Sequence, residues 1–129
     1  MNKVVLLLGL SIPFNLSASP TRCITEVLYQ EARGANAEEM VMVGNSIINQ
    51  HTRTNRPICK VTDKGYQNKR PPTKERPLYE HIARGIISGA IPDLTKGADH
   101  FNEGKKPRWP GKITRVTKHF VFYRLASVR

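Results

Sequence analysis

The stretch Leu28-Tyr29-Gln30-Glu31-Ala32-Arg33-Gly34 decides how the chain is organised. It ends an amphipathic segment in which Ile24, Val27 and Glu31 recur at helical spacing, so Glu31 shares a face with apolar side chains. Gly34 is the residue type that commonly stops a helix. The spacing therefore predicts a short helix whose last turn carries one carboxyl group on its apolar side.

That position favours the neutral form of a carboxyl group. An apolar surround disfavours the ionised form, and so does the partial negative end of a helix. A Glu that keeps its proton near neutral pH is what a general acid for glycoside cleavage needs. A structural interpretation stays open at this point, in which Glu31 is a partly buried residue paired with Arg33 or another Arg.

The rest of the chain predicts two more helices and then strands. Ser19 and Asn36 are typical N-cap residues, and Asn36 with Glu39 forms a capping-box pattern. Apolar periodicity predicts helices over about residues 20–32, 36–54 and 77–88, and alternation predicts short extended segments near 98–102, 113–117 and 119–123.

The last of these segments would place His119, Val121 and Tyr123 on one face of a strand. Residues 57–62 are predicted to form a short turn or a single helical turn, and residues 63–75 a long polar loop. About three helices followed by short strands and long loops predict one small α+β domain.

The N-terminus has the pattern of a processing segment. Lys3 precedes a continuous apolar run over residues 4–10, and small residues follow at 17–19. We expect residues 1–18 to be a signal peptide or a releasable membrane anchor, and residues 19–129 to be the catalytic domain. The expected location is therefore outside the cytoplasm, in the periplasm or cell envelope, with transient membrane contact through the N-terminal segment.

The composition points to an anionic partner. The formal net charge is +11 at pH 7, and so basic an exported protein is expected to seek polyanions. In an oxidising compartment Cys23 and Cys59 could pair, and such a bridge would stabilise the fold by about 3–4 kcal/mol in the chain-entropy picture. The four His are scattered and no C-x-x-C is present, so we expect no metal site.

Several ordered motifs resemble one family. Residues 29–34, read Tyr-Gln-Glu-Ala-Arg-Gly, resemble the Tyr-x-Glu-Ala-Arg-Gly signature of the spore cortex-lytic (SleB-like) cell wall hydrolases. Five later stretches are similar to further elements of that family, in the same order. They are residues 43–49, Pro-Ile-Cys-Lys-Val at 57–61, Gly-Ala-Asp-His-Phe-Asn at 97–102, Pro-Arg-Trp at 107–109 and His-Phe-Val-Phe-Tyr-Arg at 119–124.

The resemblance implies a compact lysozyme-like domain that cuts the glycan strands of peptidoglycan, as a lytic transglycosylase or a muramidase, with Glu31 as the catalytic acid. It implies no cofactor and no nucleic-acid partner, and nothing in the sequence suggests more than a monomer. The chain departs from the family pattern at Asn102, where a His is common, and at Gln67-Asn68, where the family has Gln-Phe.

The expected substrate contacts lie around Glu31. Phe101, Trp109 and Tyr123 could stack on sugar rings, and His119 could bind an N-acetyl group or orient Glu31. Core positions for the aromatic residues and a structural role for His119 are also open. We add Tyr29, Gln67 and Asn102 as substrate-binding candidates on the resemblance. A hydrolase needs a second carboxylate, for which Asp99 is the best candidate, although a turn-capping role for it is also open.

A lone acid suits anhydro-forming cleavage slightly better than hydrolysis. Two alternatives from other classes stay open. A secreted basic ribonuclease could use a Glu with His100 or His119 as an acid–base pair, although a surface position for His100 is the commoner case. A non-catalytic wall-binding protein would also explain the charge.

Overall fold

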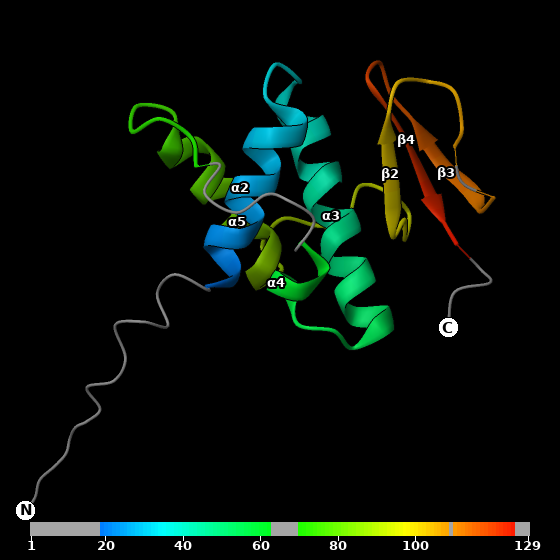
Figure 1. Cartoon of the computed structure of the whole chain (residues 1–129), viewed down its shortest axis with the longest axis horizontal. Coiled ribbons are helices and arrows are strands. Elements are labelled where there is room, and N and C mark those ends of the chain that lie inside the picture. Colours follow the sequence, from blue (N-terminus) through cyan, green and yellow to red (C-terminus); the bar gives the residue numbers. More distant parts are fainter. Residues whose placement is uncertain (1–18, 63–69, 109, 126–129) are drawn as a thin grey trace, which may run out of the picture.

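The computed structural model describes residues 19–62, 70–108 and 110–125 (Figure 1). Within these ranges the chain forms four helices and then a three-stranded antiparallel sheet, which confirms the predicted small α+β domain. The elements are α2 (Pro20–Ala32), α3 (Ala37–Thr54), α4 (Ile58–Val61), α5 (Arg76–Ser88), β2 (His100–Glu103), β3 (Lys112–Val116) and β4 (Phe120–Arg124).

The helix ends lie close to where the local sequence predicts them. The Ser19 hydroxyl accepts a hydrogen bond from the Arg22 N–H, and the Asn36 side chain accepts one from the Glu39 N–H. Gly34 and Gly89 follow α2 and α5 with φ of +89° and +84°, the left-handed region that glycine enters without a Cβ clash. The predicted single turn is α4, and α5 starts one residue before the predicted Pro77.

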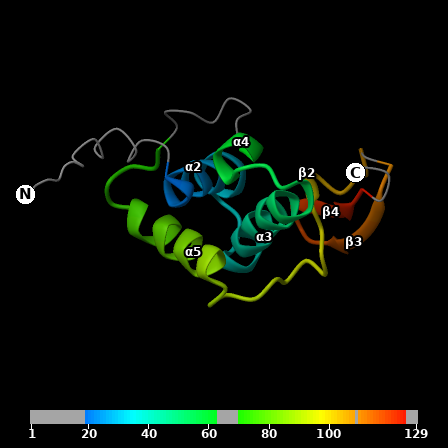
Figure 2. The same cartoon turned by 90° about the horizontal axis from the view of Figure 1, so that it is seen from below.

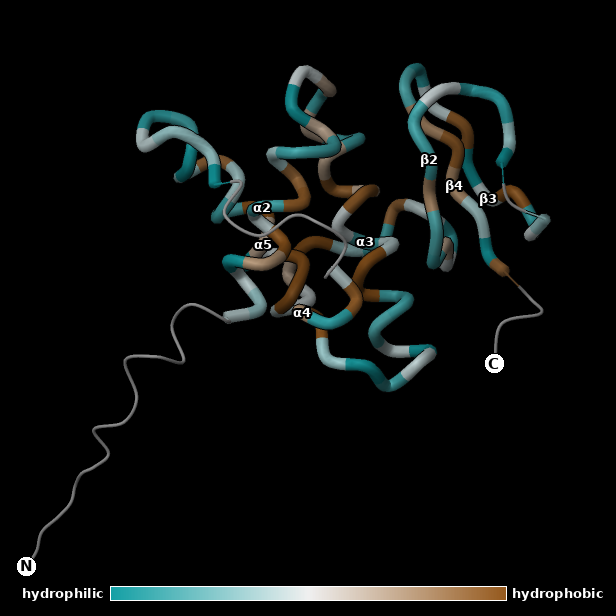
Figure 3. Tube along the Cα trace, in the orientation of Figure 1, coloured by the Kyte–Doolittle hydropathy of each residue, from teal (hydrophilic) through white to brown (hydrophobic). Residues whose placement is uncertain are grey.

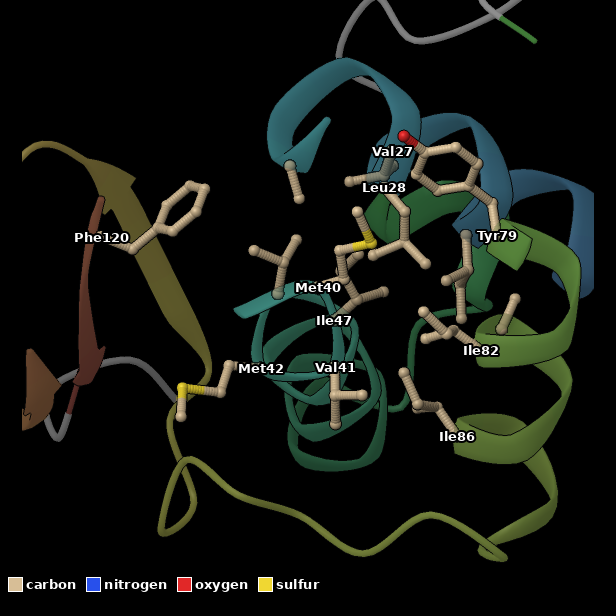
Figure 4. Packing of buried hydrophobic residues seen from close by; sticks show 14 of the residues in the cluster. Val27, Leu28, Met40, Val41, Met42, Ile47, Tyr79, Ile82, Ile86 and Phe120 are labelled. Atoms are coloured by element: carbon tan, nitrogen blue, oxygen red, sulfur yellow. The ribbon is translucent and has the colours of Figure 1, made fainter. Parts of the chain in front are cut away.

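Helix α3 lies at the centre of the molecule, between the other helices and the sheet (Figures 1 and 2). Its Met40, Val41, Met42 and Val43 are buried and contribute to one apolar core. Figure 4 shows this core extending from Ile82 and Ile86 of α5 to α3, with Phe120 of the sheet on its far side.

Gly44 allows α3 to approach α5 closely. A Cβ atom at this position would lie 2.4 Å from Cδ1 of Ile86, far inside van der Waals contact. A glycine in the interior of a helix lowers the stability of that helix by about 1 kcal/mol relative to alanine. The close packing of α3 on α5 offsets this loss.

The two cysteines form a disulfide. Cys23 lies in the first turns of α2 and Cys59 in α4, with 5.5 Å between their Cα atoms. The bridge therefore fixes the one-turn helix α4 against α2, in addition to the apolar contacts that its buried Ile58 and Val61 make in the core.

The sheet has the strand order β2-β4-β3. Phe120 and Phe122 of β4 belong to the main core, whereas Val121 and Tyr123 form a separate small cluster with Leu125. The alternation of β4 is therefore as predicted for Val121 and Tyr123. It does not extend to His119, which precedes the strand and turns its ring to Glu39 of α3.

Strand β3 departs from simple alternation because its register shifts between Ile113 and Arg115. Ile113 pairs with Tyr123 and Val116 with Val121, so the irregularity keeps both apolar side chains on the same face of the sheet. Both remain substantially exposed. Figure 3 shows that the connection between β2 and β3 is largely hydrophilic.

The apolar run at residues 4–10, and with it the predicted signal peptide or anchor, lies outside the described residues. Across residues 19–62, 70–108 and 110–125, no helix combines the length and the hydropathy needed to cross a membrane.

Candidate active site

A cavity of about 420 Å³ lies where the helices meet the sheet. Its lining comes from α2, α3, α4, β2 and the segment after β2, so residues far apart in the sequence share one wall. The described lining residues are Val27, Glu31, Ser46, Ile47, Gln50, Val61, Thr62, Asp99, His100, Phe101, Asn102, Glu103 and Arg108. This volume lies within the range of small-molecule binding sites.

Glu31 occupies the last turn of α2 and lies half-buried in this cavity. Val27, one helical turn earlier, lines the same wall, so the predicted apolar neighbour of Glu31 is present. Arg33, which the structural interpretation paired with Glu31, lies 4.9 Å from the centre of the Tyr29 ring and donates a hydrogen bond to its hydroxyl at 2.8 Å.

Asp99 lines the cavity together with Glu31, but most of its side chain is committed to the fold. One oxygen accepts hydrogen bonds from the ring Nδ1 of His100 at 2.8 Å and from the Leu125 N–H at 3.1 Å, and the other pairs with Arg53 of α3. Burial opposes ionisation of this carboxyl group, yet these hydrogen bonds outweigh it and lower the pKa of Asp99 below its usual value.

The turn before the sheet is capped by Asp93 rather than by Asp99. The Asp93 carboxylate accepts hydrogen bonds from the Thr95 N–H at 2.7 Å and from the Gly97 N–H at 3.0 Å. Burial acts against ionisation here too, but the hydrogen bonds from Thr95, Asn49 and Gly97 lower the pKa of Asp93. The turn-capping alternative for Asp99 is therefore wrong.

His100 is a cavity residue that sequence reasoning assigned to the surface. Its side chain is only 17% exposed, and its Nδ1 contacts the buried Asp99 carboxylate. An ionised carboxylate can only accept in this hydrogen bond, so Nδ1 carries the proton. The adjacent Asp-His pair at the start of a predicted strand was the one signal for this arrangement.

Phe101 and Asn102 also line the cavity, as predicted candidates. The Phe101 ring packs edge-on against Phe120, with 5.9 Å between ring centres, which ties this wall to the core. The Asn102 amide donates to the Glu103 and Lys106 carbonyls and accepts from the Tyr123 hydroxyl. These hydrogen bonds of the Asn102 side chain therefore help to shape the cavity wall.

Tyr123 does not face the cavity. It is fully buried, and its hydroxyl accepts a hydrogen bond from the Arg108 N–H at 2.8 Å. The expectation that Tyr123 stacks on a sugar is wrong, because its phenol sits behind Asn102 and Arg108 and holds them in place.

Tyr29 and His119 also lie away from the described cavity lining. Tyr29 packs edge-on against Tyr79 of α5, with ring centres 5.8 Å apart. His119 hydrogen-bonds through its N–H and its Nδ1 to the two oxygens of Glu39, at 3.0 and 2.8 Å. The predicted role of His119 in orienting Glu31 is therefore wrong. Gln67 and Trp109 lie outside the described residues.

The segment that follows Glu103 carries excess positive charge. No Asp or Glu follows Glu103 in the sequence, while cations continue through the rest of the chain. The described ones are Lys105, Lys106, Arg108, Lys112, Arg115, Lys118 and Arg124. Of these cations only Arg108 belongs to the described cavity lining, beside the acids Glu31, Asp99 and Glu103, so the surplus of positive charge lies outside that lining.

Across the described part of the chain, no group of three or more His, Cys, Asp and Glu side chains could hold a metal ion. Among the described lining residues, the acids are Glu31, Asp99 and Glu103, the histidine is His100 and the cation is Arg108. This set can donate and accept protons on a bound molecule.

Compared with known proteins, the chain matches no protein-family model, no curated protein and no solved structure.

Proposed function

We propose that this chain cleaves the glycan strands of peptidoglycan, with Glu31 as the general acid. The observation that carries the proposal is the position of Glu31, half-buried at the end of α2 in a cavity of about 420 Å³ between the helices and the sheet. The motif resemblance around residues 29–34 supports the same residue independently of the cavity.

The chemistry needs one proton donor at the bridging oxygen. The Glu31 carboxyl group gives its proton to the glycosidic oxygen while the bond from that oxygen to C1 of the sugar breaks. Either the C6 hydroxyl of the same sugar or a water molecule then bonds to C1. The hydrolytic route uses a second carboxylate. The commitment of Asp99 to Arg53, His100 and Leu125 favours the anhydro-forming route over hydrolysis through Asp99.

The disulfide between Cys23 and Cys59 supports the proposed location outside the cytoplasm, since such bridges persist in oxidising compartments. The positive charge that follows Glu103 suits an anionic wall. We accordingly propose a monomeric enzyme of the cell envelope, in wall remodelling or in phage-mediated lysis, whose N-terminal segment makes transient membrane contact.

The test is mass spectrometry of the soluble products from purified peptidoglycan. Wild type should release anhydro-muropeptides, and Glu31→Gln should release none. Glu38→Gln is a matched control, because it makes the same charge change at an exposed position and should keep wild-type release. Equal release by wild type and Glu31→Gln would refute the role of Glu31, and reducing ends in the products would establish a hydrolase.

One observation favours a second candidate, a basic ribonuclease. Glu31 and His100 line the same cavity as Arg108, which is an acid–base pair beside a phosphate-binding cation. In this case wild type would degrade RNA and leave peptidoglycan intact. A wall-binding protein without activity would cleave neither, and Glu31→Gln would bind the wall as wild type does.

A further inference from the structure

Two carboxylate–histidine pairs occur in the described structure, and they differ in where they lie. Asp99 with His100 lines the cavity that contains Glu31, whereas Glu39 with His119 joins the start of α3 to the turn before β4. We propose that His100 is the second proton-transfer group of the cavity, with Asp99 as its positioning residue. The inference rests on the proposed glycan cleavage, since it assigns the proton acceptor of that reaction.

The Asp99 carboxylate is held from several elements at once. Arg53 of α3 binds one oxygen, and the Leu125 N–H after β4 binds the other. Arg53 also lines a separate cavity of about 310 Å³ that includes Asp99 but none of the other described residues around Glu31. Arg53 therefore holds Asp99 from the side away from the reacting groups.

A carboxylate fixed in this way fixes the neighbouring imidazole. The hydrogen bond of 2.8 Å keeps the proton of the neutral ring on Nδ1, so any proton exchange between His100 and a bound molecule goes through Nε2. The Asp99 side chain is only 2% exposed, so water screens its charge poorly. Its negative charge stabilises the imidazolium that forms when Nε2 accepts a proton.

The cavity then divides the proton transfers between two residues from different elements. Glu31 of α2 gives a proton to the bridging oxygen, which also takes the electron pair of the broken bond to C1. The C6 hydroxyl oxygen bonds to C1, and its proton passes to Nε2 of His100 on β2. The products are a 1,6-anhydro end and a free hydroxyl on the departing sugar. Transfer of the proton from His100 back to Glu31 through solvent restores the starting state, and no water is consumed.

The experiment is chemical rescue of His100→Ala, measured as the initial rate of anhydro-muropeptide release. The expected loss is about 10²-fold or more, the usual contribution of one acid–base group. Added imidazole should restore part of the rate, since it can occupy the volume left by the ring. His119→Ala is the matched control, because it removes the other carboxylate-bound His and should keep the wild-type rate without any response to imidazole.

The role of Asp99 is tested in the same assay. With imidazole present, the double variant His100→Ala, Asp99→Asn should show no rescue, because the added base is no longer oriented. Circular dichroism checks that both variants are folded. If that double variant is unfolded, His100→Ala with Asp99→Glu takes its place. Its carboxylate is displaced by one methylene, so imidazole should restore less of its rate than it restores in His100→Ala alone.

The outcomes separate the inference from the function on which it rests. No product from wild type refutes the proposed function and the inference together. Product from wild type and from His100→Ala at equal rates refutes only the inference. Loss of activity in a folded His100→Ala without any rescue by imidazole also overturns it, because a ring that only shapes the wall would give that result.

Discussion

Replacing Glu39 by Gln should destabilise the fold by an amount that depends on pH. The Glu39 carboxylate is almost fully buried and accepts hydrogen bonds from the N–H and the ring of His119, from Thr117, and from the Asn36 N–H. Burial alone would raise the pKa, but these hydrogen bonds outweigh it and lower the pKa of Glu39 from 4.5 to about 2.

The size of the effect follows from that difference. A carboxyl group whose pKa falls this far on folding stabilises the folded state by about 3 kcal/mol at neutral pH. Because the folded pKa of Glu39 lies below the unfolded one, this contribution is complete above pH 4.5 and is lost as the pH falls toward 2. Glu39→Gln also points an amide NH2 at groups that are themselves donors, so little of the contribution is recovered.

The assay is thermal unfolding of wild type, Glu39→Gln and Glu38→Gln at a series of pH values between 7 and 2. Glu38 lies beside Glu39 in the same turn but is exposed, so its variant controls for the change in net charge. At pH 7 Glu39→Gln should unfold on the order of 10 °C below wild type, and the difference should shrink toward pH 2. A difference of the same size at both pH values, or one matched by Glu38→Gln, would show that the buried charge does not hold the sheet to α3.

Two further changes test the packing of the helices. Reduction of the disulfide, or Cys23→Ser with Cys59→Ser, should cost about 3–4 kcal/mol through the freed loop, and urea unfolding with and without reductant measures it. Gly44→Ala should destabilise by about 1–3 kcal/mol despite its better helix propensity, because the new methyl group meets Cδ1 of Ile86. Adding Ile86→Val removes that atom, so unfolding of the double variant should show a cost smaller than the two single costs combined.

The helices were predictable because their signals are local. The Ser19 and Asn36 caps act within three residues of themselves, and Gly89 ends α5 from the next position in the chain. The same holds for Glu31, since its neighbour Val27 on the cavity wall is one helical turn away. For such features sequence spacing and spatial proximity coincide.

The environment of the candidate site was not predictable because its contacts join distant parts of the chain. Asp99 binds Arg53 across 46 positions, and His119 binds Glu39 across 80. Spacing rules carry no information at such separations. They could not decide between a site role and a structural role for His119, or show that His100 lines the cavity. Tyr123 was misplaced for a related reason: alternation predicts which residues share a face, but it does not show what covers that face.

The order of the strands in the sheet has a consequence for how the protein is made. The central strand β4 is the last of the three in the sequence, and both neighbours pair with it rather than with each other. During synthesis β2 and β3 emerge without a partner, and Asp99 still lacks the Leu125 N–H that binds it. The wall of the cavity that β2 provides is therefore completed only after β4 has left the ribosome, so a nascent chain contains Glu31 long before the cavity around it is complete.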